Sequence, residues 1–366
     1  MQIQLAREAL LKPVATVAGV VERRQTLPIL SYLLIGAADG RVTFTGTDLE
    51  AEIVTSATCD VIKAGDVTVP ARKILDICRA LPEGVVVTLS KQTDKVLLQA
   101  GRSRFSLSTL PTTDFPKVEA ESFEQALTIE KLSLKNAIER TAFCMAQQDV
   151  RYYLNGLYLE IEGKRLRAVA TDGHRMAMTE VEGVSGGTKA LQVIVPRKGV
   201  QEISRLLVAD EGSARLEFGA NHARLTLEDL VFTTKLIDGK FPDYTKVIPN
   251  NQSKMVHLNR QAFREALSRV AILANEKYRG IRLNLESGKL RVTAHNPEQE
   301  EAVEEVETNF SGGSLEIGFN VNYLIEAVGA LPVEEVVLGL NDSNSSCTVR
   351  AEGDGATQYI IMPMRL

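Results

Sequence analysis

The chain has 366 residues, 44% of them hydrophobic and 24% charged, which is enough for two or three soluble domains with cores of their own. It has no run of 18 apolar residues and no charged N-terminal stretch followed by an apolar one, so the sequence argues against a membrane-spanning helix and a secretory signal. The net charge of −5 does not by itself favour nucleic-acid binding.

The four cysteines are Cys59, Cys78, Cys144 and Cys347. They are scattered along the chain and lack the close spacing of a metal site. Buried free thiols in a reducing compartment are therefore favoured over disulfides. We expect a cytoplasmic protein without a metal or cofactor.

The first third of the chain is expected to begin with a helix over 7–24, with Leu10, Val14 and Val17 on one face. Pro13 should kink or divide this helix, because proline lacks the backbone donor. Asp39–Gly40 between two alternating runs predicts a hairpin turn. A second helix is expected over 72–80, and strands over 31–37, 41–45, 49–56, 85–89, 95–100 and 104–109.

The same order of elements returns twice. Helices are expected over 130–146, 197–207, 260–273 and 319–331, between linkers at 112–127 and 243–256. The expected strands are 156–161, 166–171, 175–181, 214–218, 222–226, 231–236, 280–285, 289–295, 301–306, 335–340, 347–351 and 358–362. The second helix of each set follows a short apolar run that begins at Val69, Val195 or Phe319, 126 and 124 residues apart.

This repeat predicts three domains, over 1–122, 123–248 and 249–366. Each has two helices and six or more short strands, so the fold class is α+β. The helices must pack on the sheets of their own domain, because either element alone would leave an apolar face in water.

The predicted helices are more basic than the rest of the chain. The six segments hold 16 Lys and Arg against eight Asp and Glu, whereas the remainder holds 26 against 39. Exposed helices usually interleave the two signs, so this partition favours helices that face a polyanion such as duplex nucleic acid. Ordinary scatter in the charge count is the alternative. No base-reading motif accompanies the basic helices, so contacts would be to phosphates and independent of sequence.

Asp48, Glu50 and Glu52 alternate along an expected strand and could bind a hard cation. No fourth oxygen ligand is evident, so solvated strand carboxylates are favoured.

Asp172 and His174 could form an acid–base pair. The corresponding stretch of the first domain begins with Thr47–Asp48 and lacks the histidine, so a shared turn is the favoured interpretation. A hydrolase or nuclease that uses this pair stays an alternative hypothesis. No nucleophile–base constellation or metal set emerges elsewhere, and we expect a protein that is not an enzyme.

The ends of the chain carry opposite charges. An acidic run covers 297–305, whereas Arg102 and Arg104 lie beside Phe105 on an expected edge strand near Lys73. Opposite charges at opposite ends could steer head-to-tail association, which closes a ring if its rotation closes. The last eight residues are unusually apolar, and either form a final core strand or contribute to a Met-rich peptide site.

The chain resembles the β subunits of bacterial DNA polymerase III, the sliding clamp family, over its whole length. The motifs that carry the resemblance are spread in order along the chain: 26–30 (TLPIL), 45–50 (TGTDLE), 101–111 (GRSRFSLSTLP), 149–156 (DVRYYLNG), 170–175 (ATDGHR), 239–244 (GKFPDY), 275–280 (NEKYRG) and 362–366 (MPMRL).

The resemblance implies a head-to-tail homodimer whose six domains form a ring, with helices lining a hole for duplex DNA and sheets outside. It implies a processivity factor that encircles DNA without sequence preference and tethers the replicative polymerase α subunit. The clamp loader, other polymerases and repair proteins would bind through short peptides similar to Gln-Leu-x-Leu-Phe. A DNA-binding scaffold that forms no ring is the alternative.

Three sets of site residues follow from the resemblance. The partner peptide would contact Leu154, Thr171, Gly173, His174, Arg175, Met176, Pro242, Lys246, Val247, Asn320, Tyr323, Ser346, Ile360, Met362, Pro363, Met364 and Arg365. DNA would contact Arg24, Arg72, Gln148, Tyr152, Tyr153 and Arg197. The dimer interface would join Lys73, Arg102, Arg104, Phe105 and Leu107 to Ile272, Leu273, Glu298, Glu300 and Glu304. Met176, Lys246, Tyr278 and Asn344 depart from residues often found in the family, which bears on peptide selectivity.

Overall fold

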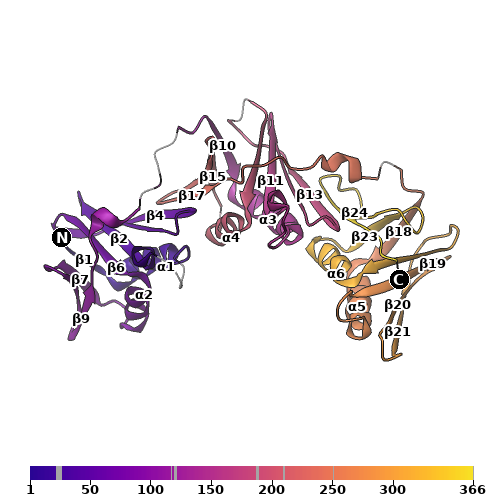
Figure 1. Ribbon diagram of the computed structural model, residues 1–366, viewed down its shortest axis with the longest axis horizontal. Helices are drawn as coiled ribbons and strands as arrows, with labels where there is room; N and C mark the ends of the chain where they lie inside the picture. Colours follow the sequence, from indigo (N-terminus) through magenta and orange to yellow (C-terminus); the bar gives the residue numbers. More distant parts are fainter. Residues whose placement is uncertain are drawn as a thin grey trace. The chain divides into compact units, whose positions relative to one another are not determined.

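The computed structural model describes residues 1–21, 27–116, 118, 122–186, 189–208, 211–249 and 251–365 (Figure 1). The chain packs as two compact units. The first comprises Met1–Leu132 and Gln201–Leu236, and the second comprises Ser133–Val200 and Ile237–Leu366. The division between them falls inside helices α3 (Lys131–Thr141) and α4 (Arg197–Leu206).

The first unit contains two antiparallel sheets and two complete helices, α1 (Arg7–Val17) and α2 (Ala71–Ala80). The five-stranded sheet has the order β5 (Asp60–Lys63), β1 (Gln2–Ala6), β7 (Val86–Lys91), β8 (Lys95–Ala100) and β9 (Ser103–Ser108). The eight-stranded sheet has the order β10 (Gln125–Glu130), β15 (Ser213–Phe218), β16 (His222–Leu227), β17 (Leu230–Lys235), β4 (Ala51–Thr58), β3 (Arg41–Thr47), β2 (Tyr32–Ala38) and β6 (Gly65–Pro70).

The second unit is built in the same way around helices α5 (Arg260–Val270) and α6 (Val321–Ala330). Its eight-stranded sheet has the order β14 (Leu191–Pro196), β11 (Gly156–Glu162), β12 (Arg165–Thr171), β13 (Arg175–Val181), β25 (Thr357–Ile361), β24 (Cys347–Ala351), β23 (Glu335–Leu340) and β18 (Lys254–Asn259). Its four-stranded sheet has the order β21 (Glu301–Glu307), β20 (Lys289–His295), β19 (Gly280–Glu286) and β22 (Leu315–Asn320). Short 3₁₀ helices occur at Pro28–Ser31, Thr112–Asp114, Ala142–Cys144, Tyr152–Leu154, Tyr244–Val247 and Ala271–Leu273.

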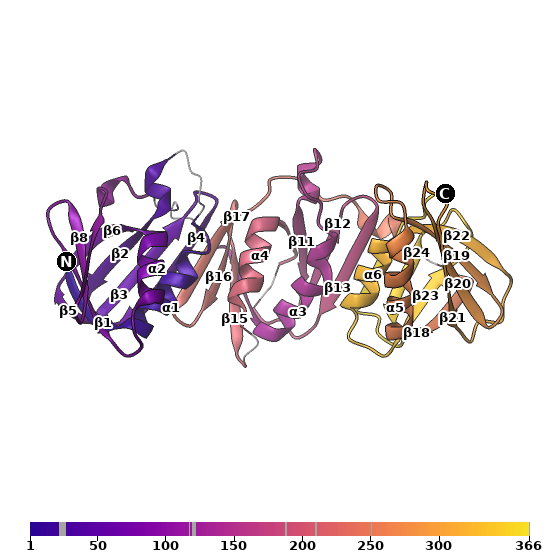
Figure 2. The same cartoon turned by 90° about the horizontal axis from the view of Figure 1, so that it is seen from below.

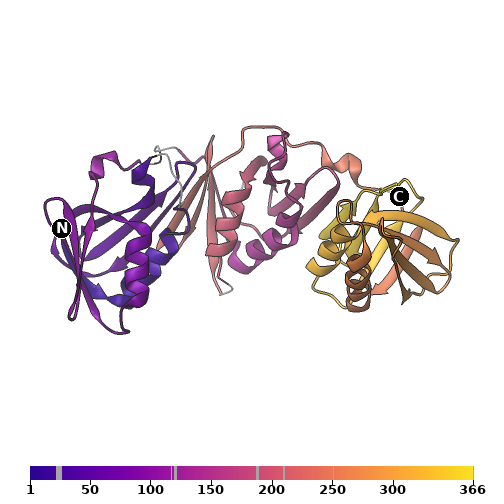
Figure 3. The same ribbon diagram turned by 60° about the horizontal axis from the view of Figure 1, so that its bottom comes forward.

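The predicted α+β class is confirmed, and the helices pack on sheet faces. In the first unit α1 contacts β3, β4 and α2, and in the second α5 contacts β20, β21 and α6 (Figures 2 and 3). Leu10, Val14 and Val17 of α1 are fully buried, as their spacing predicts. Strands β2 and β20 alternate buried with partly exposed residues, because one face of each meets the core.

The predicted end of the first helix is wrong. The helix ends at Val17, and Ala18–Val20 form turns rather than a continuation toward residue 24. Pro13 lies inside the helix and does not divide it, whereas a kink at Pro13 stays a prediction. The buried contacts of Pro13, Val14 and Val17 outweigh the missing backbone hydrogen bond, so tertiary packing overrides the local preference.

The hairpin at Asp39–Gly40 is confirmed, since both residues have positive φ (48° and 74°), as a type I′ turn requires. All four cysteines are buried free thiols. None of the helices in the described ranges has both the length and the apolar composition that crossing a membrane would need.

Candidate functional site

The second unit contains an apolar pocket of about 220 Å³. We call it the apolar pocket, and its walls come from four separate parts of the chain. It is lined by Arg151, Tyr153, Leu154, Thr171, Gly173, Arg175, Met176, Pro242, Asp243, Tyr244, Val247, Ile360 and Met362. A concave apolar site with a few convergent polar groups is the usual form of a ligand pocket.

One wall of the pocket is the turn between β12 and β13. The Thr171 hydroxyl donates to the Arg175 carbonyl (2.7 Å), and the Asp172 carboxylate accepts from the backbone N–H groups of His174 and Arg175 (2.9 and 3.0 Å). Gly173 has φ +88°, which an L side chain rarely adopts. The turn predicted from Thr171 to Arg175 is therefore present, and the Asp172 carboxylate stabilises it by accepting two backbone hydrogen bonds.

The same turn occurs in the first unit between β3 and β4. The Thr47 hydroxyl donates to the Ala51 carbonyl (2.8 Å), and the Asp48 carboxylate accepts from the N–H groups of Glu50 and Ala51. The predicted strand face of acidic residues is therefore wrong, because Asp48 and Glu50 lie in a turn. Among the residues that the structure describes, no group of three or more His, Cys, Asp or Glu could hold a metal ion.

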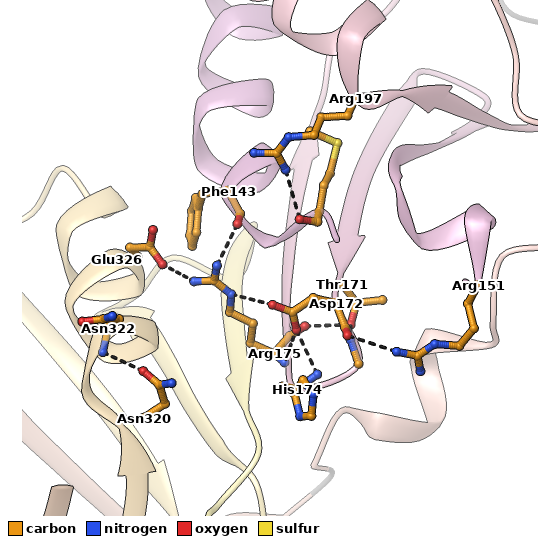
Figure 4. A network of polar contacts seen from close by, with 12 residues as sticks. Phe143, Arg151, Thr171, Asp172, His174, Arg175, Arg197, Asn320, Asn322 and Glu326 are labelled. Atoms are coloured by element: carbon orange, nitrogen blue, oxygen red, sulfur yellow. Dashed lines mark hydrogen bonds and ion pairs between the residues drawn. The ribbon is translucent and has the colours of Figure 1, made fainter. Parts of the chain in front are cut away.

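Arg175 joins this turn to α6 and to the chain after α3 (Figure 4). Its guanidinium donates to Asp172 (3.1 Å) and to the Phe143 carbonyl (2.9 Å) and forms an ion pair with Glu326. It also lies over the rings of Tyr323 and Phe143, 4.4 and 5.4 Å from their centroids. Only 11% of the side chain is exposed, so planar stacking and charge pairing together stabilise a buried cation.

A second wall is the segment from Asp149 to Asn155. Arg151 donates from Nε and Nη2 to the two carboxylate oxygens of Asp149 (3.0 and 2.9 Å), and from Nη2 to the Asp172 carbonyl (3.3 Å). The hydrogen bond from the Arg151 side chain lowers the pKa of Asp149 to about 2. Asn155 accepts from the Asp149 N–H and donates to its carbonyl, which closes the loop.

The floor of the pocket belongs to a buried apolar cluster. Leu154, Met176 and Ile360 are at most 2% exposed and pack with Tyr158 and Tyr244. The Tyr244 hydroxyl donates to Glu160 (2.8 Å) and accepts from Arg167 (2.8 Å), so its polar end is satisfied inside the cluster.

The C-terminal segment forms the rim. Ile360 and Ile361 are core residues of β25, whereas Met362 is 36% exposed and donates its N–H to the His174 carbonyl (2.9 Å). Met364 then pairs with Gly318 of β22. The final core strand is present in Ile360 and Ile361, and Met362 lines the pocket beside it, whereas a Met-rich peptide site stays a prediction.

Nine of the residues predicted to contact a peptide line this pocket: Leu154, Thr171, Gly173, Arg175, Met176, Pro242, Val247, Ile360 and Met362. The others lie around it or further away. His174 is in the turn, Lys246 pairs with Asp243 (3.2 Å), Tyr323 stacks on Arg175, and Asn320 caps α6. Ser346 precedes β24, Pro363 follows Met362, and Met364 and Arg365 line a different hollow.

The pocket also contains Arg151, Asp243 and Tyr244, which were not predicted to line it, and Tyr153, which was predicted to contact DNA. Asp149 and Arg151 are two residues apart, a local pattern that indicates a charged turn. Nothing local indicates that Tyr244 reaches Glu160, 84 residues away.

The predicted DNA contacts lie in separate places. Arg72 is exposed on α2 beside Asp76 (4.0 Å), whereas Arg197 donates to the Met145 carbonyl (3.1 Å; Figure 4). Gln148 and Tyr152 are exposed, and Tyr152 meets Tyr153 edge to face. Arg24 lies outside the described residues.

The predicted interface residues occupy two strand edges and the ends of helices. Arg104, Phe105 and Leu107 belong to β9, the edge strand of the five-stranded sheet, with Arg102 just before it and Lys73 exposed on α2. Glu304 belongs to β21, the edge of the four-stranded sheet, and pairs with Arg269 (2.7 Å). Glu298 and Glu300 precede β21, and Ile272 and Leu273 follow α5, with Ile272 77% exposed.

Family models of the DNA polymerase III beta subunit match nearly the whole chain: the N-terminal domain at residues 1–119, the central domain at 128–243 and the C-terminal domain at 245–365. The chain belongs to the DNA polymerase III β subunit family. The predicted resemblance and three-domain fold are thus confirmed, while the exact domain bounds stay a prediction.

The chain is similar to members of this family over their full lengths and its own. The chain is 51% identical to the beta sliding clamp of Pseudomonas aeruginosa and 46% identical to that of Escherichia coli K12, each over 100% of both chains. Among solved structures, a sliding clamp from Pseudomonas aeruginosa bound to griselimycin has 51% identity and a TM-score of 0.97, and Caulobacter crescentus pol III beta has 38% identity and a TM-score of 0.95, each with 100% coverage of both chains.

Proposed function

We propose that this chain is a DNA sliding clamp: two copies close head to tail into a ring that encircles duplex DNA and tethers the replicative polymerase. It acts without catalysis and without a cofactor, in the cytoplasm. The observation that carries the ring is a pair of unpaired, oppositely charged strand edges that repeat the junctions inside the chain.

The junctions inside the chain are antiparallel strand pairs. In the first unit β4 pairs with β17, and in the second β13 pairs with β25. Each joins the edge of one domain's sheet to that of the next, giving eight strands. By the same repeat, β21 should pair with β9 of another copy, because these strands occupy the corresponding edges.

The repeat also supplies the register of this third junction. Phe232 lies opposite Ile53, and Tyr359 lies opposite Ala177. Phe105 holds the place of Phe232 in its hairpin, opposite Leu98 as Phe232 is opposite Leu225. Ala302 holds the place of Ile53, since these residues face Ala294 and Gly46 in their sheets.

Phe105 of one copy would therefore lie opposite Ala302 of the other. In this register Arg104 lies opposite Val303. Its diagonal neighbours on the other copy are Glu301 and Glu305, which the long Arg104 side chain can reach. Phe105 and Leu107 alternate with the outward Arg104, so the buried and exposed faces of the two strands agree.

The charge of the helices supports DNA inside the ring. With their bounds in the structure, the six helices of the described chain hold 14 Lys and Arg against six Asp and Glu, although the whole chain is acidic. Contacts to phosphates are independent of sequence and weaken with salt. A ring needs only such weak contacts, because the topological link keeps it on DNA.

The apolar pocket supports the tethering role. Its buried floor and the Met362 rim suit two or three apolar side chains of a short peptide similar to Gln-Leu-x-Leu-Phe. The proposed partners are the polymerase α subunit, the clamp loader, other polymerases and repair proteins, which would compete for this pocket.

Retention on DNA tests the ring. The protein is loaded onto nicked circular DNA at moderate salt, and bound protein is measured before and after a single cut. We expect retention on the circle and rapid loss from the linear form. Equal retention on both would contradict the ring and favour the alternative, a DNA-binding scaffold without ring closure.

A further inference from the structure

A row of polar side chains crosses the eight-stranded sheet of the second unit. We call it the polar row, and its members lie opposite one another on four neighbouring strands: Gln192 on β14, Glu160 on β11, Arg167 on β12 and Glu180 on β13. Glu160 accepts hydrogen bonds from Gln192 (3.0 Å) and from Arg167 (2.8 Å). Arg167 also donates to Glu180 (2.7 Å). The charged members are partly buried, with 21–22% of each side chain exposed, and each has an opposite charge beside it.

The polar row lies on the same face of the sheet as the floor of the apolar pocket. Two residues away on the same four strands is an apolar row that belongs to the buried cluster of the pocket: Ile194, Tyr158, Val169 and Met178. Met176, two residues beyond Met178 on β13, lines the pocket itself. Side chains two residues apart on a strand point to one face. The pocket, the apolar row and the polar row therefore follow one another across this face.

Tyr244 links the pocket to the polar row. It is 7% exposed, and its ring lines the pocket and packs in the buried cluster. Its hydroxyl donates to Glu160 and accepts from Arg167, both at 2.8 Å. Burial and the hydrogen bond to Glu160 raise the pKa of Tyr244, so the hydroxyl stays protonated at neutral pH and can donate.

The segment that carries Tyr244 depends on its side chains for attachment. We call residues 237–248 the connector, and it supplies one wall of the pocket through Pro242, Asp243, Tyr244 and Val247. The backbone N–H of Ile237 donates to β14 (2.9 Å), and among the described residues no other backbone hydrogen bond joins the connector to the sheet. Two aromatic side chains attach it instead. Phe241 stacks on Tyr158, with ring centroids 4.7 Å apart, and the Tyr244 hydroxyl reaches the polar row.

We infer that Arg167 and Glu160 are positioning residues for peptide recognition, which hold the connector wall of the pocket in place through the Tyr244 hydroxyl. Neither residue is among those that line the pocket, so both act without touching the peptide. When the wall is in place for only a fraction of the time, the apparent Kd rises by the inverse of that fraction. This inference rests on the proposed peptide-binding function.

The test measures the affinity of a labelled peptide, Gln-Leu-Asp-Leu-Phe, for the full-length protein by fluorescence anisotropy. Tyr244→Phe removes the hydroxyl and keeps the ring. It should weaken binding about fivefold, or about 1 kcal/mol, which corresponds to a wall that is in place about a fifth of the time. Arg167→Met should have a similar effect. If Arg167→Met does not fold, Tyr244→Phe decides the inference by itself.

The double variant separates positioning from a general loss of stability. If both residues act through one contact, Tyr244→Phe combined with Arg167→Met should bind about fivefold weaker, as each single variant does. Independent effects would multiply to about 25-fold. Arg165→Met is the matched control, because Arg165 lies two residues from Arg167 on the same face of β12 and pairs with Glu162 and Glu180, each at 3.5 Å. It should keep the original affinity.

The outcomes distinguish the inference from the function on which it rests. No binding of the peptide to the unaltered protein would overturn the proposed peptide function and this inference with it. Binding that Tyr244→Phe leaves within twofold of the unaltered protein would overturn the inference alone. So would multiplied losses in the double variant, or a loss in Arg165→Met as large as that in Arg167→Met.

Discussion

Arg175 shows how much of the site depends on a single buried side chain. Its guanidinium connects the β12–β13 turn through Asp172, the chain after α3 through the Phe143 carbonyl, and α6 through Glu326. Removing it would leave Asp172 and Glu326 without their cation, and an unpaired charge in a partly buried site costs more than the pair itself contributes. Pocket geometry and local stability are therefore linked at this residue.

Gly173→Ala should weaken binding of a peptide such as Gln-Leu-Asp-Leu-Phe to the apolar pocket by about tenfold. An alanine at φ +88° costs about 1–2 kcal/mol, and its Cβ would lie 2.9 Å from Nη2 of Arg151, which must move out of the pocket wall. Isothermal titration measures the change. Gly163→Ala is the control, since Gly163 also has positive φ (+61°) but has no neighbouring atom within 4 Å of the added Cβ. Equal losses in both variants would contradict a local effect.

The carboxyl of Asp149 should titrate near pH 2, because the hydrogen bond from Arg151 favours its charged form. Since the pKa in the folded state lies below the ordinary value of 3.8, the stabilisation is complete above about pH 4 and is lost as the pH falls toward 2. Carbon-detected NMR measures the midpoint. Arg151→Ala should raise it toward the ordinary value, and an unchanged midpoint would show that Arg151 is not the cause.

At the scale of elements, repeated local chemistry supports the same connection twice. Thr47–Ala51 and Thr171–Arg175 form the same turn, in which an aspartate accepts two backbone N–H groups. Only the second opens onto the apolar pocket. The helix ends are stabilised in different ways. Helices α5 and α6 have asparagine N-caps, whereas a carbonyl near the C-terminus of α1 accepts a hydrogen bond from Arg205.

Arg205→Ala should loosen the end of α1. Nη2 of Arg205 donates to the Thr16 carbonyl (2.9 Å), one of the last carbonyls of the helix, where a cation is favourable. Loss of one such bond costs about 1 kcal/mol, so the amides of Ala18 and Gly19 should exchange about fivefold faster. Hydrogen exchange followed by NMR tests this. Arg215→Ala, which loses only a pair with Glu217 on β15, should leave these amides unchanged.

At the scale of the whole molecule, the proposed assembly depends on strand edges. An unpaired edge is a template for pairing with another chain. Among the edge strands of the described sheets, β9 ends the five-stranded sheet and β21 the four-stranded sheet, and these two carry opposite charges. The junctions β4–β17 and β13–β25 show how this fold joins such edges. The third junction repeats the first two between copies, so the proposed ring needs no new kind of contact.

Arg104→Glu should weaken the proposed dimer at least about tenfold, because it places like charges beside Glu301 and Glu305 at both interfaces. Adding Glu301→Arg to the same chain should restore much of the affinity, since a head-to-tail dimer carries both changes at each interface. Sedimentation velocity measures the dimer. Arg350→Glu on the interior strand β24 should have no effect, and failure of the double variant to recover would contradict the proposed register.

Much of the local structure could be predicted from the sequence. Strands at 95–100, 175–181, 289–295, 335–340 and 347–351 have the predicted bounds. Apolar residues alternate along 289–295, whereas the other four are short runs with consecutive buried residues. At Pro13 the local sequence is misleading. Proline disfavours a helix interior, but the packing of α1 against β3 and β4 keeps the helix continuous. Strand β10 was not predicted: its first three residues lie in the predicted linker and its last in the predicted helix, because six residues before a helix carry too little pattern to assign.

By itself, the sequence determined the three repeats, the basic helices and, through its motifs, the family. Only the tertiary structure decided which side chains share a site. The apolar pocket draws Arg151, Met176, Tyr244 and Met362 from distant parts of the chain. Local periodicity reports which face of an element is buried, but strand register and long-range packing set which faces meet, and these depend on contacts between residues far apart in the chain.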